Sequence, residues 1–294
     1  AEIVCPSVVL LGEVVMEPEK VVPYFGTVEK PECHMLYNVT TMATTWNSIA
    51  TRDIRLLKKQ MDIVNSLPKQ YTFLNYLRCH DDIGWGLDFA TLKEWGMDEP
   101  SHKRYLNDFF TGKHPGSDSR GELYNDDPVT QDARFCGTTA SMCGIEAALF
   151  EKDDEKLKRG IREDLMLHAY MLTQSGIPML YSSDEIGRLN DYSYKEAADS
   201  RYIHRGAFQW ELAGKRNSKS SVEGQIFQTL SRMEQIRSQE SVFDKDCDVY
   251  TYDVHDDSIL CILRQKGNER FIGIFNFSDS EKLPGCRRRE PSVI

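Results

Sequence analysis

The sequence predicts an α/β fold, in which a parallel sheet is followed by a small antiparallel β region. Short apolar strands alternate with helical segments over residues 1–243, a pattern typical of parallel sheets built from βα units. Beyond residue 244 the pattern changes to strands in which apolar and polar residues alternate. A long polar stretch over residues 84–136, rich in Asp, Gly and aromatic residues, follows the third parallel strand.

The parallel part is predicted to hold four βα units. Its strands are expected at residues 8–11, 34–37, 72–77 and 177–181. Its helices are expected at residues 18–24, 42–50, 54–65, 103–110, 138–150, 156–173 and 222–239. Four units form half of an eight-stranded (β/α)8 barrel or a small doubly wound sheet. The long insertion favours the half-barrel, because loops that follow the strands of a barrel carry its active site.

The antiparallel part is predicted from three strands separated by Asp-Asp and Lys-Gly turns. The strands are expected at residues 249–254, 258–264 and 270–276. We therefore expect two domains, a partial barrel over 1–243 and a partial β-sandwich over 244–294.

Composition limits the classes of function. The formal net charge of −10 over 294 residues argues against a nucleic-acid or anionic-lipid surface. The eight cysteines are scattered and are expected to be reduced, mostly buried thiols. No stretch suits a membrane span, and the apolar N-terminus lacks the basic region of a signal peptide. We expect a cytoplasmic protein, the alternative being a secreted one whose signal lies upstream of this fragment. The chain opens on a strand and closes on a basic tail, so we expect a fragment of a longer protein.

Three of the four predicted strands end in carboxylates, namely Glu13, Asp81-Asp82 and Asp184-Glu185. In a barrel these positions converge on one face. The alternative is that each acid caps a helix or stabilises a turn. Metal binding is a further alternative, although the spacing of a calcium loop is missing and no His or Cys pair has zinc spacing. Converging carboxylates suit glycoside chemistry, in which one acid protonates the leaving oxygen and others stabilise an oxocarbenium-like transition state.

A set of motifs in fixed order resembles the amylosucrases, a branch of the α-amylase superfamily (glycoside hydrolase family 13). They are VVPYFG at 21–26, MLYN at 35–38, Trp46-Asn47, HDDIGW at 80–85, DARFCGTT at 132–139, DEIGRLND at 184–191, DSRYIHR at 199–205 and GQIF at 224–227. The resemblance extends over nearly the whole chain and implies strands five to eight of the barrel. It also implies sucrose and α-glucan as substrates and no cofactor or metal.

The resemblance implies a role for six residues. Glu13 matches the general acid/base, and Asp81 matches the carboxylate that binds sugar hydroxyls and stabilises the transition state. His80 would hydrogen-bond the same sugar. Asp82 and Arg134 would shape the acceptor subsite, and Arg201 would close the donor pocket with an acidic partner from outside this chain. Arg134 and Arg201 could instead be ordinary ion-pair residues.

Other residues are expected to be structural. Trp85 is interpreted as loop packing rather than a sugar platform, and His102, His168 and His204 as core or surface residues.

The nucleophile of a retaining mechanism is not found in this sequence. It would be an Asp after the fourth strand in an R-x-D context, and the candidate Arg162-Glu163-Asp164 lies in a predicted helix. We therefore expect this chain to be inactive alone. The alternatives are another enzyme of the superfamily (a sucrose hydrolase, sucrose phosphorylase or α-glucosidase) and a non-catalytic carbohydrate-binding fragment.

Overall fold

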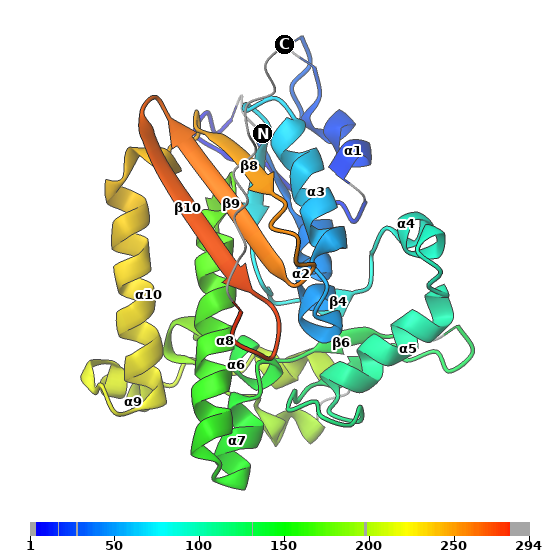
Figure 1. The fold of residues 1–294 in the computed structure, drawn as a ribbon, viewed down its shortest axis with the longest axis vertical. Helices are drawn as coiled ribbons and strands as arrows, with labels where there is room; N and C mark the ends of the chain where they lie inside the picture. The colour runs from blue at the N-terminus through cyan, green and yellow to red at the C-terminus, as the bar shows by residue number, and fades with distance from the viewer. Residues whose placement is uncertain (1–3, 17, 28, 131, 197–198, 283–294) are drawn as a thin grey trace.

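The computed structural model describes residues 4–16, 18–27, 29–130, 132–196 and 199–282. Its central element is a parallel sheet with the strand order β1-β2-β3-β7 (Figure 1). The strands are β1 (Leu11–Gly12), β2 (Met35–Tyr37), β3 (Thr72–Asn75) and β7 (Ile177–Pro178). A strand is present at each of the four predicted places, and each is shorter than predicted. β1 overlaps the predicted strand at 8–11 only at Leu11.

Helices connect successive strands of this sheet. They are α1 (Pro18–Val21), the 3₁₀ helix η1 (Val22–Phe25), α2 (Val39–Thr51), α3 (Arg55–Ser66) and α8 (Asp154–Thr173), and α10 (Val222–Gln239) follows β7. Two of the long helices have side-chain N-caps. Asp153 accepts hydrogen bonds from the backbone N–H of Glu155 and Lys156, and Ser221 accepts one from Gly224. These caps explain why α8 and α10 begin where they do.

The helix predicted at 138–150 is two helices, α6 (Thr139–Met142) and α7 (Ile145–Glu151). Gly144 separates them with a φ of +81°, a conformation that favours glycine. A Cβ at this position would also lie 2.9 Å from Cβ of Asp118. The apolar periodicity continues through the break, so the periodicity alone predicted one helix.

The insertion after β3 is more ordered than predicted. It contains α4 (Phe89–Glu94), α5 (Glu99–Phe110) and an antiparallel sheet in the order β4-β6-β5, formed by β4 (Ile83–Gly84), β6 (Arg134–Cys136) and β5 (Glu122–Tyr124). Trp85 is buried, stacks near Phe110 and Phe135, and donates from Nε1 to Asn107 at 2.8 Å. The interpretation of Trp85 as a packing residue is confirmed.

The stretch after β7 is mostly irregular and contains short helices. They are η2 (Asp184–Ile186), η3 (Tyr192–Glu196), η4 (Ser200–His204), α9 (Trp210–Ala213) and η5 (Gly214–Asn217). Asn190 fixes this stretch to the insertion, because its Oδ1 accepts from the backbone N–H of Thr138 (2.8 Å) and its Nδ2 donates to the carbonyl of Arg120 (2.9 Å). The two polar loops therefore form one surface.

The C-terminal antiparallel sheet has the order β10-β9-β8 and follows η6 (Ser241–Phe243). Its strands are β8 (Asp248–Tyr252), β9 (Ile259–Lys266) and β10 (Glu269–Asn276), which confirms the three predicted strands. The sheet lies against α8 (Figure 1), and its Leu260, Ile262 and Phe275 share a hydrophobic cluster with Trp46 and Tyr170. The domain boundary near residue 244 stays a prediction. The basic C-terminal tail, with Cys286, lies outside the described residues.

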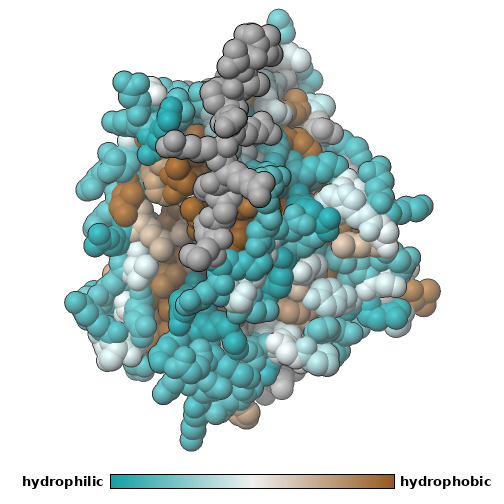
Figure 2. All heavy atoms as spheres, in the orientation of Figure 1, coloured by the Kyte–Doolittle hydropathy of each residue, from teal (hydrophilic) through white to brown (hydrophobic). Residues whose placement is uncertain are grey.

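The face of the molecule seen in Figure 2 is largely hydrophilic, with apolar residues gathered between α10 and β10. There α8, α10 and β10 line an apolar cavity of about 230 Å³ that includes Leu172, Ile236 and Phe271. Within the described residues no helix has the length and apolarity needed to cross a membrane. Of the described cysteines, Cys79, Cys136, Cys143, Cys247 and Cys261 are buried, as expected.

Candidate active site

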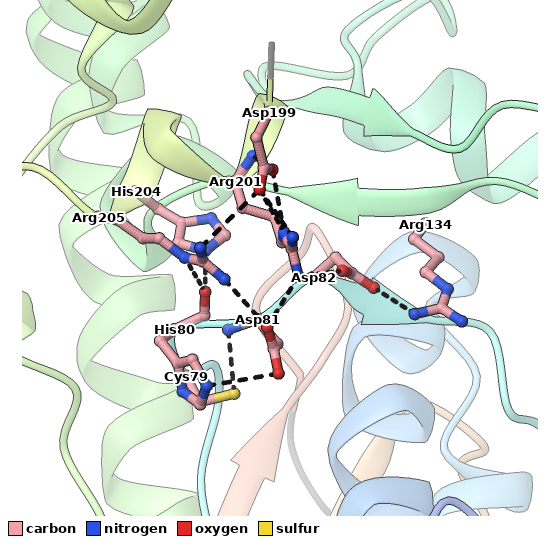
Figure 3. Close-up of polar contacts among 9 residues, drawn as sticks. All are labelled: Cys79, His80, Asp81, Asp82, Arg134, Asp199, Arg201, His204 and Arg205. Carbon is pink, nitrogen blue, oxygen red and sulfur yellow. Dashed lines mark hydrogen bonds and ion pairs between the residues drawn. The ribbon is translucent and has the colours of Figure 1, made fainter. Parts of the chain in front are cut away.

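The segment 78–82 follows the carboxyl end of β3, and its side chains lie in different surroundings. Arg78 turns into the protein, whereas His80 and Asp81 face the polar surface formed by the two loops (Figure 3). Arg201 and Arg205, which lie in and just after η4, meet this segment from the other side. The structure therefore brings together residues that are about 120 positions apart in the sequence.

Asp81 contacts two arginines and one histidine. Its Oδ1 accepts hydrogen bonds from Nη1 of Arg201 (3.2 Å) and Nη2 of Arg205 (3.0 Å). Its Oδ2 lies 3.4 Å from Nε2 of His80. The side chain is 32% exposed, so one carboxylate oxygen is held by the protein while the group stays accessible to a ligand.

Asp82 has different neighbours, although it is adjacent to Asp81. Its Oδ2 accepts from Nη1 of Arg134 at 3.2 Å, and its Oδ1 lies 3.9 Å from Nη1 of Arg201. The Asp82 side chain is 4% exposed and Arg134 is 57% exposed. Burial, together with the negative charges of Asp82 and Asp199, raises the pKa of the nearby Cys136 thiol.

Arg201 is fixed from several directions. Its Nε and Nη2 donate to both oxygens of Asp199, at 2.7–3.0 Å, and its guanidinium lies 4.8 Å from the ring centroid of Tyr124. These hydrogen bonds lower the pKa of Asp199 to about 2 and raise that of Arg201. The acidic partner that the resemblance implies for Arg201, from outside this chain, stays a prediction. Within the described residues Arg201 contacts Asp199, Asp81 and Asp82.

Glu13 follows β1 and is exposed. It lies at the same edge of the parallel sheet as Asp81, with Tyr37 of β2 between their strands. The pKa values of Tyr37 and Tyr76 are raised, mainly by burial and further by the charges of Cys79, Glu13 and Asp81. Both carboxylates thus contribute to the electrostatic surroundings of these two phenols.

Asp184 does not join this cluster, which corrects the expectation that all three strand-end acids converge. Its Oδ1 accepts from Nε and Nη2 of Arg78 (2.9 and 2.6 Å), and its Oδ2 accepts from Thr139 (3.1 Å). Both charged side chains are almost fully buried, at 1% for Arg78 and 3% for Asp184. This pair links the segment after β3 to η2, which follows β7.

Three residues of the region were not predicted from the sequence, namely Arg78, Asp199 and Arg205. Asp199 and Arg205 are the first and last residues of the quoted DSRYIHR motif, which carried a signal for both. His204 was expected to be a core or surface residue, and it is buried directly behind His80. His102 is buried beside Asn47, and His168 is buried beside Asp164 in α8.

The described residues contain no group of three or more His, Cys, Asp or Glu side chains arranged to hold a metal ion. The surface cluster instead combines carboxylates with guanidinium groups. A carboxylate in the position of Asp81 can accept hydrogen bonds from sugar hydroxyls and can stabilise positive charge that develops on a sugar ring.

No protein-family model matches the chain, but individual proteins of known sequence or structure resemble it. Glucosylglycerate phosphorylase of Escherichia coli is 22% identical over 278 residues, which cover 94% of this chain and 46% of that protein. The structure resembles sucrose 6F-phosphate phosphorylase from Thermoanaerobacter thermosaccharolyticum, with a TM-score of 0.65 at 17% identity over 92% of this chain and 48% of that one. An alpha-amylase from H. orenii gives a TM-score of 0.52 at 15% identity over 94% and 44%.

These likenesses confirm the predicted fold class. The chain has the fold of the C-terminal half of an α-amylase-type (β/α)8 barrel, followed by a small antiparallel β region. It spans about half the length of the proteins it resembles. An amylosucrase-like specificity and the roles of the individual site residues stay predictions.

Proposed function

We propose that this chain forms the C-terminal half of the active site of a retaining α-glucosyl transferase or hydrolase of the α-amylase superfamily. We further propose an amylosucrase-like enzyme that takes glucose from sucrose. The observation that supports this best is the arrangement around Asp81. An accessible carboxylate follows the third strand, His80 lies beside one of its oxygens, and Arg201 donates to the other.

In this proposal Glu13 protonates the leaving oxygen and later activates the attacking hydroxyl. Asp81 and His80 bind the hydroxyls of the donor glucose, and Asp81 stabilises its oxocarbenium-like transition state. Asp82 and Arg134 line the acceptor side, where they form the contact at 3.2 Å. Arg201 closes the donor pocket.

A retaining mechanism needs a nucleophilic carboxylate about 5–5.5 Å from the acid/base. Asp164, the one acid of this sequence in an R-x-D context, lies buried in α8 beside His168 and does not face the cluster. The nucleophile in our proposal comes from the N-terminal half of the barrel. We therefore propose that the 294-residue chain binds sugar weakly and does not turn it over alone.

A phosphorylase is the second candidate, and the comparisons favour it specifically. Two of the similar proteins are phosphorylases by name, and one of those names contains sucrose 6F-phosphate. Arg134 and Arg201 also give the cluster two guanidinium groups, which suit a phosphate acceptor. In this variant inorganic phosphate replaces the glucan hydroxyl as the acceptor.

The test uses two proteins, this chain and the product of any coding sequence that continues upstream of Ala1. Each protein is given sucrose alone, sucrose with glycogen, or sucrose with phosphate. Fructose release with glucan growth supports the first proposal. Glucose 1-phosphate formed only with phosphate supports the second. Turnover by this chain at the rate of a full-length relative overturns the assignment of the nucleophile to another segment. Absence of fructose from both proteins under all conditions overturns the use of sucrose.

An Asp81→Asn variant is the control in each assay. It removes the proposed catalytic charge while keeping the size of the side chain, so turnover that stays at the wild-type level would identify a contaminating activity.

A further inference from the structure

The backbone carbonyl of His80 accepts hydrogen bonds from two side chains at once. Nε of Arg205 lies 2.5 Å from this oxygen, and Nε2 of His204 lies 3.2 Å from it (Figure 3). The two donors are consecutive residues at the end of η4, and they lie more than 120 positions from His80 in the sequence. One peptide group of the site is thus held by two side chains from the neighbouring loop.

Arg205 makes a second contact that connects this peptide group to the carboxylate of Asp81. While Nε donates to the carbonyl of His80, Nη2 donates to Oδ1 of Asp81 at 3.0 Å. Oδ1 also accepts from Arg201, so its lone pairs are used by two guanidinium groups. Oδ2, beside Nε2 of His80, is left as the oxygen that can face a ligand.

His204 supplies its hydrogen bond as a neutral imidazole. It is buried between Arg78 and Arg205, and burial together with these two cations lowers its pKa to about 3. Because Nε2 faces a carbonyl oxygen, Nε2 carries the ring proton. Nδ1 is buried and has no hydrogen-bond partner within the described residues. The ring therefore contributes one hydrogen bond in this region, the one to His80.

We propose that Arg205 and His204 are positioning residues that clamp the His80 peptide group and fix which oxygen of Asp81 faces the ligand. The clamp acts through His80 and Asp81 and does not itself touch the sugar. The effect of the clamp on turnover rests on the proposed function. The clamp contacts themselves lie within this chain and do not depend on that function. Small displacements of reacting groups reduce rates strongly, so fixing one peptide plane at this point affects catalysis.

An NMR experiment on the 294-residue chain tests the clamp without any activity. The Nε2–H proton of the buried His204 ring is followed in wild type, Arg205→Gln and Arg205→Lys. Loss of the competing guanidinium leaves His204 as the main donor to the carbonyl, so its proton signal is expected to move downfield in Arg205→Gln and less in Arg205→Lys. An unmoved signal in Arg205→Gln overturns the clamp.

Arg216→Gln is the matched control for this experiment. Arg216 also donates to a backbone carbonyl, that of Ala213, at 3.0 Å, and it lies in the same irregular stretch away from the cluster. Its loss should leave the His204 signal in place. A shift of equal size in this variant would mean that the stretch loosens generally and would overturn the specific role of Arg205.

A kinetic experiment on a protein that turns over sucrose tests the consequence for catalysis. Arg205→Gln is expected to lower kcat by about 10²-fold with little change in KM, because it displaces reacting groups rather than removing a binding contact. His204→Gln, which keeps a donor, should retain most activity, whereas His204→Phe should lose it. Equal activity of the two His204 variants overturns the catalytic part. If the wild type is inactive on sucrose, the proposed function fails and the NMR result still decides the clamp.

Discussion

The segment 78–82 after β3 takes part in two ion-pair systems, one formed by Arg78 and the other by Asp81. The two systems differ in their access to water. Arg78 and Asp184 form a buried pair whose described contacts are with protein groups. Asp81, three residues later, is one-third exposed and is held by Arg201 and Arg205 on one oxygen. The closed pair links the segment after β3 to η2, and the open one presents charge to a ligand.

The difference shows that a strand-end carboxylate gives no indication of its own role. Asp184 and Asp81 both follow short apolar strands, and the sequence analysis predicted that both lie on one face of the barrel. A buried pair whose oxygens are all hydrogen-bonded is a structural feature, because removing one partner leaves a charge without compensation in a medium of low polarity. The open cluster around Asp81 is partly exposed, so a change in it costs less folding stability, and its side chains are accessible to a ligand.

The closed pair should have the largest effect on stability. Arg78→Ala or Asp184→Ala leaves a buried charge unpaired, and we expect either to lower the free energy of unfolding by about 3–5 kcal/mol. Urea denaturation of the chain measures this. The double variant Arg78→Met/Asp184→Leu removes both charges and should lose much less. A single-variant loss below about 1 kcal/mol would contradict the structural role.

The open cluster should show the opposite behaviour. Asp81→Asn is expected to lower kcat of an active protein by about 10²–10³-fold, because a charge that stabilises the transition state is lost. Its unfolding midpoint should stay close to wild type. Asp126→Asn changes an exposed carboxylate on the insertion that follows Asp81. This variant is the control for a general effect of charge. Unfolding of the Asp81 variant at low urea would show that this region is structural after all.

His204 lies between the two systems and should make stability depend on pH. Its folded-state pKa, about 3, is below the ordinary value of 6.5, so the unfolded chain binds more protons between these values. Stability is complete above pH 6.5 and falls as the pH drops. Between pH 6.5 and 5 we expect wild type to lose about 2 kcal/mol more than His204→Gln, by urea denaturation at each pH. Equal losses in the two proteins would contradict a buried neutral ring.

The smallest effect is expected at the exposed edge of the cluster. Arg134 is more than half exposed, and Asp82 keeps Arg201 at 3.9 Å when Arg134 is removed. Arg134→Ala should therefore change the free energy of unfolding by less than about 1 kcal/mol. In an active protein the same variant should lower the ratio of glucan transfer to hydrolysis. A larger loss of stability would show that Arg134 has a structural role like that of the buried Arg78–Asp184 pair.

Periodic patterns predicted the long elements well. Helix α10 has the predicted bounds, and the strands of the C-terminal sheet are within a few residues of theirs. The sheet of the insertion was missed, because strands of two and three residues hold no period to detect. The left-handed conformation of Gly144 divides the helix predicted at 138–150 into two. The spacing of apolar residues carries no information about that conformation, so it could not predict the break.

The site was predicted in part. The motifs indicated His80, Asp81, Asp82, Arg134 and Arg201, and the structure places these five side chains in one cluster, with Glu13 at the same edge of the sheet. Arg205 was missed because its contacts depend on how the loop after β7 lies over the end of β3. That placement follows from loop packing, including the hydrogen bonds of Asn190 to the insertion.

The sequence by itself determined the long helices, the strands of the parallel and C-terminal sheets, and the chemical groups available at the strand ends. It also carried the motifs that indicate α-glucoside chemistry. These are local properties, because apolar periods and short motifs are properties of neighbouring residues. Only the tertiary structure decided which acids stay open, since burial and pairing depend on segments more than 100 positions apart. For that reason Asp184 became a closed partner of Arg78, whereas Asp81, three residues after that arginine, stayed open beside His80.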